Sequence, residues 1–338
     1  MRMNIERVGL SGADTGKIRA CFEVSLAAQR VDEPEGPWFT ERPFTGWLTV
    51  GWDGNPREAW LATDQGSPAG WYRLELPVRE NVDQAHLDIV VHPAARRRGL
   101  GRALLRHAAG RAAEHGRTVL NGDPRRGSPG EAFARSAGAK PGMVDVQRML
   151  DIGKLEKGRL ARLRGPAERA AAGYSLVSWA GPVPEEYIEQ AAAVYNGMAD
   201  APRDPEITHE PWDADRVRER VNDLRRHYGM RDYTVAARHD DTGELAGLTE
   251  VSVDPADPGW GFQVFTVVRR EHRGHRLGLL LKVAMMELLA TTEPQLERIV
   301  TWNGQGNEHM ISVNEAMGYT VFGPPATRFR LDVAAVPA

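Results

Sequence analysis

The hydrophobic and polar positions of the chain follow two periods, and these alternate in a definite order. Apolar residues at every second position predict strands, whereas apolar residues three or four positions apart predict amphipathic helices. The first half is expected to contain a strand, a helix, three strands, a helix, a strand, a short helix and a final strand. The expected segments are residues 4–10, 14–29, 59–62, 70–76, 86–91, a helix that ends near Gly116, 118–120, 131–137 and 144–150.

The second half repeats this order of elements. The expected segments are residues 174–179, 184–198, 233–238, 247–253, 261–268, a long helix to Leu289, 296–302, 310–317 and strands from Tyr319 onward. Between the halves, residues 153–172 have the pattern of a charged helix that is interrupted at Gly165-Pro166, which suits a linker. We therefore predict an α/β fold with a mixed sheet and helices on both faces in each of two domains, at residues 1–152 and 173–338.

A constant offset relates the two halves. Gly101 aligns with Gly278 and Gly70 aligns with Gly247, and each pair is 177 positions apart. A shared offset in two separate elements indicates an internal duplication. The 338 residues are enough for two domains that each bury a core of their own.

Each half contains a turn rich in glycine and arginine between an apolar strand and a helix. Such a turn directs successive backbone N–H groups at one point, and the positive end of the helix adds to them, so the turn suits a pyrophosphate. A dinucleotide-binding fold is disfavoured because several strands precede each turn. The residues expected at the two turns are Val91, Arg96, Arg97, Arg98, Gly99, Leu100 and Gly101, and Val267, Val268, Arg273, Gly274, His275, Arg276, Leu277, Gly278 and Leu279.

The strand, turn and helix resemble the acyl-coenzyme A binding motif Arg/Gln-x-x-Gly-x-Gly/Ala of the GCN5-related N-acetyltransferases, the GNAT superfamily. The doubling resembles the tandem members of this family. The first turn fits the motif, whereas the second has Arg276 at the first glycine position and Gly274 two residues earlier. The resemblance implies two tandem acyl-CoA N-acyltransferase domains, with acetyl-CoA or another acyl-CoA as the cofactor and a small-molecule amine as the substrate.

The resemblance also assigns residues that follow the fifth strand of each domain. Family members carry an Asn there and, seven residues later, a Tyr whose phenol protonates the departing thiolate. These positions hold Asn307 and Asn314 in the second half, but Gly127 and Ala134 in the first. We assign Asn314 to stabilisation of the thiolate, and the alternatives are Asn303, Ser312 or a water molecule. Asn303 and Asn307 are expected to contact the coenzyme, and the alternative is that they only shape the turn between them.

The offset also identifies a candidate base. Glu250, in an apolar strand of the second half, matches Arg73 of the first. An isolated acid of this kind is either functional or ion-paired. The functional interpretation makes Glu250 the base that deprotonates the amine, so the second domain is expected to be catalytic and the first non-catalytic.

The strand next to Glu250 supplies further polar positions. Gln263 matches His86, and Phe265 matches Asp88. Alternate residues of a strand share a face, so Gln263 and Phe265 are expected on one face with Gln263 toward the substrate. The first half keeps His86 and Asp88 as a polar pair, which leaves some activity of that half open.

An acidic segment is the candidate acceptor-binding region. GNAT members bind the acceptor largely with the region that corresponds to residues 198–213, and we expect Asp200 and Asp204 to attract a cationic amine. The alternative is a solvated acidic loop. The five acids of the segment are Asp200, Asp204, Glu206, Glu210 and Asp213.

Charge and cysteine content exclude several classes of protein. The net charge of −3 gives no general attraction to nucleic acid, and no 18-residue apolar run suits a membrane span. The single cysteine, Cys21, excludes an internal disulfide and lies in a helical pattern, so we expect it to be buried and not a nucleophile. With no signal-like start, a cytoplasmic location is expected. No metal is expected, and the chain is expected to be a monomer or homodimer.

These expectations combine in one functional hypothesis. The chain is expected to transfer an acetyl group from acetyl-CoA to a primary amine of a small molecule, and tandem members suggest antibiotic modification or self-resistance as its role. The alternatives are a longer-chain N-acyltransferase of natural-product biosynthesis and a CoA-binding module without turnover.

Overall fold

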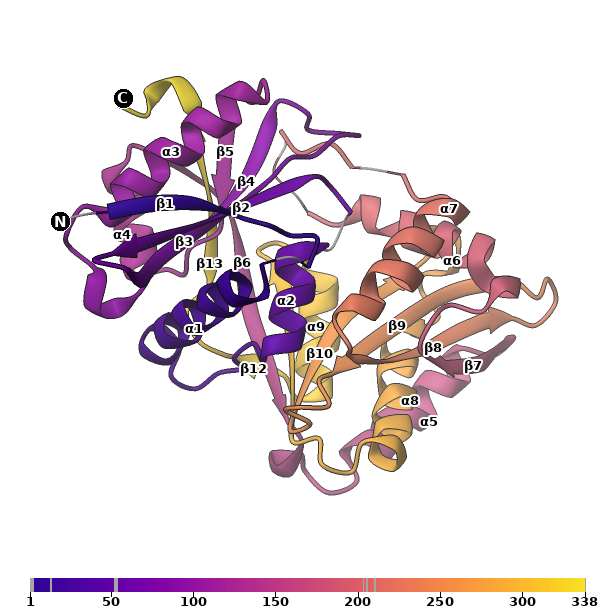
Figure 1. Ribbon diagram of the computed structural model, residues 1–338. Helices are drawn as coiled ribbons and strands as arrows, with labels where there is room; N and C mark the ends of the chain where they lie inside the picture. The colour runs from indigo at the N-terminus through magenta and orange to yellow at the C-terminus, as the bar shows by residue number, and fades with distance from the viewer. Residues whose placement is uncertain are drawn as a thin grey trace. The chain divides into compact units, whose positions relative to one another are not determined.

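The computed structural model describes residues 3–12, 14–51, 54–202, 204, 206–209 and 211–337. The chain divides into two units (Figure 1). The first comprises Met1–Val144, Asp204–Glu210 and Pro324–Ala338, and the second comprises Asp145–Arg203 and Pro211–Gly323. The predicted domains were sequential, whereas each of these units includes segments from both copies of the repeat.

The first unit is built on a mixed sheet with the strand order β1-β2-β3-β4-β5-β13. Strands β4 and β5 are parallel and the other neighbours are antiparallel. The pairing of β4 with β5 ends at His86 and Asn121, beyond which the two strands separate. The strands are β1 (Met3–Val8), β2 (Arg57–Asp64), β3 (Ser67–Glu75), β4 (Gln84–Val91), β5 (Val119–Gly122) and β13 (Ala326–Asp332).

Helices cover both faces of this sheet. Helices α1 (Thr15–Asp32) and α2 (Glu41–Thr49) pack on one face around Cys21 and Trp71. Helix α3 (Leu100–Glu114) packs on the other face, and α4 (Pro129–Ser136) follows β5. Helix α2 is not among the segments expected from the sequence, and its apolar residues Phe44 and Leu48 are buried in the core.

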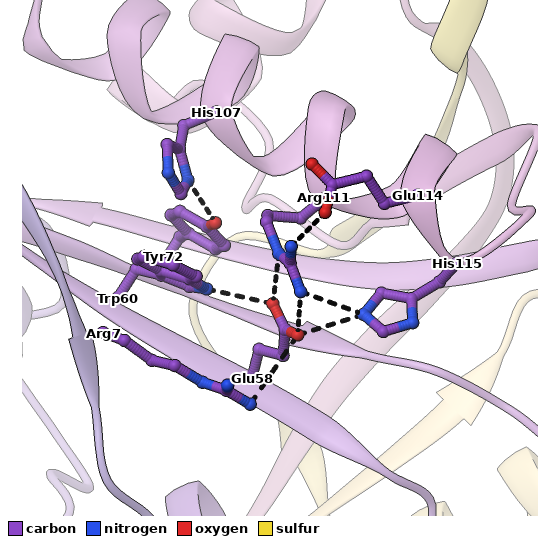
Figure 2. Close-up of polar contacts among 8 residues, drawn as sticks. All are labelled: Arg7, Glu58, Trp60, Tyr72, His107, Arg111, Glu114 and His115. Atoms are coloured by element: carbon purple, nitrogen blue, oxygen red, sulfur yellow. Dashed lines mark hydrogen bonds and ion pairs between the residues drawn. The ribbon is translucent and has the colours of Figure 1, made fainter.

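A buried carboxylate anchors the C-terminal end of α3 to the sheet (Figure 2). Glu58 of β2 is held by Arg111 at 2.8 and 2.5 Å, by His115 at 3.0 Å and by the indole of Trp60 at 3.1 Å. The hydrogen bonds from Arg111 are the main reason why the pKa of Glu58 falls to about 2. The figure also shows Arg7, Tyr72, His107 and Glu114.

The second unit repeats the arrangement with the strand order β6-β11-β10-β9-β8-β7. Strands β10 and β11 are parallel, and the other neighbours are antiparallel. A short strand, β12, pairs with β6. The strands are β6 (Lys140–Asp151), β7 (Tyr174–Ala180), β8 (Arg231–His239), β9 (Leu245–Val253), β10 (Trp260–Val268), β11 (Arg298–Gly304) and β12 (Thr320–Val321).

Helices α5 (Arg159–Ala170) and α8 (Leu277–Thr292) pack on one face of this second sheet, and α6 (Ile188–Tyr195) packs on the other with α7 (Ala214–Arg216). Helix α9 (Glu308–Met317) follows β11. The expected interruption at Gly165-Pro166 is wrong, because α5 continues through Pro166. A proline removes one helical hydrogen bond, and the buried Ala167 and Ala171 behind it hold the helix against α8.

The final strands of the two copies are exchanged between the units. Strand β6 ends the first copy, but its residues 145–151 pair with β11 of the second unit. Strand β13 ends the second copy, but it pairs with β5 of the first unit. No helix in the parts of the chain that the structure describes is long and apolar enough to cross a membrane.

Candidate functional site

The two turns of the repeat have the same backbone conformation. Arg97 and Gly99 adopt positive φ angles of 64° and 84° in the first, and Gly274 and Arg276 adopt 90° and 53° in the second. The left-handed positions therefore coincide under the offset, with glycine and arginine in the opposite order. This explains the departure of the second turn from the family motif, because Gly274 supplies one of the two left-handed positions and Arg276 adopts the other.

The close contacts around the turns are also repeated. A Cβ atom on Gly70 would lie 2.9 Å from the carbonyl oxygen of Val90, and one on Gly247 would lie 2.7 Å from that of Val267. Both distances are too short for a side chain. The matched glycines allow β3 and β9 to approach the ends of β4 and β10, from which the turns begin.

Arg96 fastens the first turn. Its guanidinium donates to the carbonyl of Val91 at 3.2 Å and binds both carboxylate oxygens of Asp32 at 2.7 and 2.6 Å. Arg273 makes the same contacts in the second turn. It donates to the carbonyl of Val268 at 3.3 Å and pairs with Asp200 at 2.8 Å. Both arginines are thus engaged in holding the turns.

The starts of the two helices differ in their surroundings. A Cβ atom on Gly101 would lie 3.4 Å from the ring of Phe133, whereas one on Gly278 would meet nothing within 4 Å. A ligand therefore has open space over the first turn of α8. Among the predicted neighbours, Leu100, Leu277 and Val267 are buried, Leu279 is half-buried, and Arg98 and His275 are exposed.

Strand β10 contains a β-bulge that β4 lacks. Val251 of β9 lies opposite Gln263 and Glu250 lies opposite Phe265, so Val264 is an extra residue. The corresponding pairing of β3 with β4 is regular from Gly70 to Glu75. A bulge removes backbone groups from the ladder and redirects side chains, and bulges are frequent beside active sites.

The bulge overturns one expectation from the sequence. Gln263 and Phe265 were expected to share a face, but Gln263 contacts Lys282 of α8, whereas Phe265 contacts Tyr195 of α6. The extra residue between them reverses the alternation of the strand. Gln263 therefore lies on the α8 side of the sheet.

Glu250 is buried in an ion pair on the opposite side. Its carboxylate accepts a hydrogen bond from the phenol of Tyr195 and pairs with the guanidinium of Arg225 at 2.8 Å. Burial, and next the charge of Glu250, raise the pKa of Tyr195 well above 10. The carboxylate of Glu250, the phenol of Tyr195 and the guanidinium of Arg225 thus form a triad that is almost completely shielded from solvent, which we call the Glu250 triad.

Aromatic rings surround this triad. The ring of Tyr195 lies 4.7 Å from that of Trp212 and 5.4 Å from that of Phe265. The guanidinium of Arg220 lies over Trp212, and burial followed by the charge of Arg225 lowers the pKa of Arg220 to about 10. Tyr195 and Arg225 were not recognised in the sequence. Tyr195 falls in an expected helix, and Arg225 follows a helical segment without a regular apolar period.

The three asparagines near α9 take different places. Asn307 caps the helix, and its side chain accepts the N–H of Met310 at 3.3 Å, as in the alternative that it shapes the turn. Asn314 is fully buried and donates to the side-chain oxygen of Asn303 at 2.8 Å. This bond joins α9 to the end of β11 that follows Val300, where β11 is no longer paired with β10.

The predicted acidic segment is divided between the units. Asp200 pairs with Arg273 in the second, whereas Asp204 belongs to the first and accepts the backbone N–H of Met143 at 2.9 Å. Asp213 caps α7, and Glu206 pairs with Arg330 in the first unit. Glu210 lies outside the described residues. The four acids that the structure describes therefore do not form one cluster.

The first copy has a different set of polar residues at the matching position. Arg73 pairs with Asp88 at 2.9 Å, and His86 lies 3.6 Å from Asp88 and 3.8 Å from Asp123. Burial opposes protonation of His86, but the two carboxylates raise its pKa above the usual value. No set of His, Cys, Asp and Glu among the described residues suits a metal ion.

Comparison with known proteins agrees with this geometry. Residues 21–124, in the first copy, match the family model of the acetyltransferase (GNAT) family. No curated protein matches the chain. The diverging parallel strands, the turn and the helix, each present twice, have the arrangement of a tandem GNAT fold, and the match to the GNAT family model lies in the first copy.

A solved structure of similar organisation is the tandem GNAT protein from the clavulanic acid biosynthesis pathway. It is 28% identical, with a TM-score of 0.81 and coverage of 98% of both chains. A GCN5-related N-acetyltransferase from Sphaerobacter thermophilus shares the fold at 15% identity, with a TM-score of 0.69 and coverage of 98% of this chain and 96% of that one. Another from Kribbella flavida shares it at 10% identity, with a TM-score of 0.54 and coverage of 97% and 70%.

Proposed function

We propose that the protein transfers an acyl group, most simply acetyl, from acyl-CoA to a primary amine of a small molecule, and that the second copy carries the reaction. One observation supports the choice of copy above all. The β10 bulge and the Glu250 triad lie beside each other in the second copy, whereas the first has a regular ladder and Arg73 at the corresponding position. The first copy then serves as a binding or scaffolding domain.

The second turn is the proposed site of acyl-CoA. Backbone N–H groups of residues 274–278 and the positive end of α8 are suited to the pyrophosphate. The open space over Gly278 supports a close approach of the ligand to the helix. The separation of β10 from β11 after Phe262 and Val300 leaves strand-edge groups for the amide-rich arm, with Asn303 on that side.

The Glu250 triad supplies a route for the proton of the amine. Bound acyl-CoA contributes the thioester, and the amine forms the new C–N bond as the C–S bond breaks. In our proposal the Tyr195 oxygen takes the proton from the amine while its own proton passes to Glu250, so the carboxylate is the final acceptor. Arg225 holds Glu250 in place on its other side.

The departing thiol requires less assistance. A thiol has a pKa near roughly 8.5, so its anion leaves without a strong acid when dipoles stabilise it. The buried amide pair of Asn314 and Asn303 is the proposed dipole, and Asn314 stands where a tyrosine is usual in the family. No tyrosine phenol is assigned to this step.

The acceptor is proposed to be a small molecule of natural-product type, with antibiotic modification or self-resistance as the role. Support comes from the similarity to the tandem protein of the clavulanic acid pathway. A cytoplasmic location belongs to the same proposal. Cys21 takes no part, because it is a free, buried thiol whose pKa burial raises to about 12.

The test uses the purified full chain, acetyl-CoA and longer acyl-CoAs, a panel of small-molecule amines, and a colour reaction for free thiol. We expect amine-dependent thiol release, fastest with acetyl-CoA. Faster release with a longer donor would identify a longer-chain N-acyltransferase. Tight coenzyme binding in calorimetry, with no thiol release for any amine, would identify a binding module and refute the proposal.

A further inference from the structure

A buried lysine lies beneath the bulge of the second copy. Lys282 of α8 is 2% exposed, and no carboxylate of the described residues forms an ion pair with it. Its ammonium donates to the side-chain oxygen of Gln263 at 2.9 Å and lies 5.0 Å from the ring centre of Tyr319. Burial lowers the pKa of Lys282 to about 7. A buried lysine without an acidic partner is unfavourable, so its position calls for a compensating contact or role.

Gln263 uses the other end of its amide to satisfy the bulge. Its side-chain nitrogen lies 2.7 Å from the carbonyl of Glu250 and 2.9 Å from that of Phe265. It also lies 2.9 Å from the hydroxyl of Thr249. The ammonium form of Lys282 has only donors and pairs with the oxygen of the carboxamide, so it fixes the orientation in which the Gln263 nitrogen faces these acceptors. The side chain thus stands in for ladder bonds that the bulge removes.

The first copy shows the same place without a bulge. The bulge shifts the register by one residue, so the structural counterpart of Gln263 is Leu87 and not His86. Leu87 lies opposite Leu74, and Gln263 lies opposite Val251, which is 177 positions after Leu74. Leu105 is the residue 177 positions before Lys282, and both leucines belong to the core beneath α3. The first copy thus combines a regular ladder with Leu87 and Leu105, whereas the second copy combines a bulged ladder with Gln263 and Lys282.

We propose that Lys282 and Gln263 are positioning residues of the second copy: Lys282 orients the Gln263 carboxamide, which holds β10 in its bulged register beside the acyl-transfer site. This inference rests on the function proposed above. Neither side chain touches the substrate in this account. They act through the backbone of residues 263–265, whose bulge directs Phe265 toward Tyr195 and places the Glu250 triad beside the acyl group.

The decisive variant replaces the pair by that of the first copy. Lys282→Leu with Gln263→Leu should leave Tm unchanged or raise it, because buried polar pairs are often no more stabilising than apolar ones. We expect kcat to fall about a hundredfold or more, since small misplacements near the reacting atoms have effects of this size. The KM for acyl-CoA should change less than about threefold, because the turn at residues 273–278 is untouched.

Two further variants separate positioning from packing. Gln263→Glu keeps the contact with Lys282 but removes both amide donors, so kcat should again fall. Met286→Leu, one turn further along α8 and also buried, is the matched control and should keep full activity. A lower kcat in this control, equal to that of the leucine pair, would assign the effect to general packing and overturn the proposal.

Hydrogen exchange provides a readout that does not depend on turnover. In the leucine-pair variant the backbone amides of residues 263–266 should change their exchange rates by about tenfold or more, while those of β4 stay as they are. Unchanged exchange together with unchanged kcat would refute the pair's role. If the wild-type chain turned over no amine, the proposed function would fail, and the exchange result would still show whether the pair holds the bulge.

Discussion

At the scale of single residues, the two turns show how one backbone conformation is reached with different sequences. The left-handed positions are filled by Arg97 and Gly99 in one turn and by Gly274 and Arg276 in the other. An L-residue in this conformation costs about 1–2 kcal/mol, so each turn accepts that cost at one position. The contacts of Arg96 and Arg273 hold both turns in place.

The open face of Gly278 predicts a selective loss of coenzyme binding. Gly278→Val places a branched side chain over the turn, and we expect the Kd for CoA to rise at least tenfold, about 1.4 kcal/mol. Arg269 is already paired with Glu244 and Glu271, so Arg269→Gln should change the Kd less than about threefold. Isothermal titration calorimetry measures both values, and equal effects would contradict the assignment of the turn.

The Glu58 cluster predicts a pH-dependent contribution to stability. The folded-state pKa of Glu58, about 2, is lower than the value near 4.3 expected in the unfolded chain. Its stabilisation is thus complete above pH about 4.3 and disappears as the pH falls toward 2. Glu58→Gln should lower the free energy of unfolding by about 3 kcal/mol at pH 7, because it leaves Arg111 and His115 without their anion.

Urea unfolding at a series of pH values checks this prediction. The difference between wild type and Glu58→Gln should shrink steadily from pH 5 to pH 2. A difference that stays constant over this range would show that the carboxylate charge makes no contribution.

The pH dependence of the rate follows from the tyrosines. With Asn314 in place of the usual tyrosine, no phenol is assigned to protonation of the thiolate. Burial raises the pKa of Tyr319 above 10, and Tyr195 is raised well above 10 as well. Neither phenol ionises to a phenolate in the resting enzyme below pH 10, and the relay through Tyr195 returns a proton to its oxygen, so kcat should rise with pH along a single limb. A bell-shaped profile whose alkaline limb is lost in Tyr319→Phe would show that Tyr319 is the acid.

At the scale of elements, the close pairing of strands β9 and β10 requires a glycine at position 247. A Cβ atom on Gly247 would lie 2.7 Å from the carbonyl of Val267, so Gly247→Ala must push the two strands apart. We expect a loss of about 2 kcal/mol in the free energy of unfolding. Gly278→Ala, whose Cβ meets nothing within 4 Å, is the control and should leave stability unchanged or raise it slightly. If the urea midpoints of Gly247→Ala and Gly278→Ala fell by the same amount, the close contact at Gly247 would not be the cause of the loss.

Most elements were predictable from the sequence, and the exceptions have physical causes. Alternation identified the strands, and the constant offset of Gly70 and Gly101 from their counterparts identified the repeat. The bulge at Val264 was not predictable, because its extra residue leaves the spacing of β10 to the following turn unchanged. The partner of Glu250 was not predictable either, because Arg225 lies in a stretch without apolar periodicity.

At the scale of the whole molecule, the exchange of final strands could not be read from the sequence. A strand pattern shows that a segment pairs with a neighbour, but it does not show which neighbour. Strand β6 pairs with β11 and β13 pairs with β5, so each unit contains strands from both copies. The acidic segment is divided for the same reason, because Asp204 belongs to the first unit and Asp200 to the second.

The central claim is that the second copy carries out the transfer, and steady-state thiol release from acetyl-CoA with a productive amine tests it most directly. Glu250→Gln removes the proton acceptor and should lower kcat at least a hundredfold, about 2.7 kcal/mol. His86→Gln changes the partly exposed polar residue of the first copy and should leave kcat within about twofold. A chain in which His86→Gln abolishes thiol release while Glu250→Gln does not would place the reaction in the first copy and contradict the account.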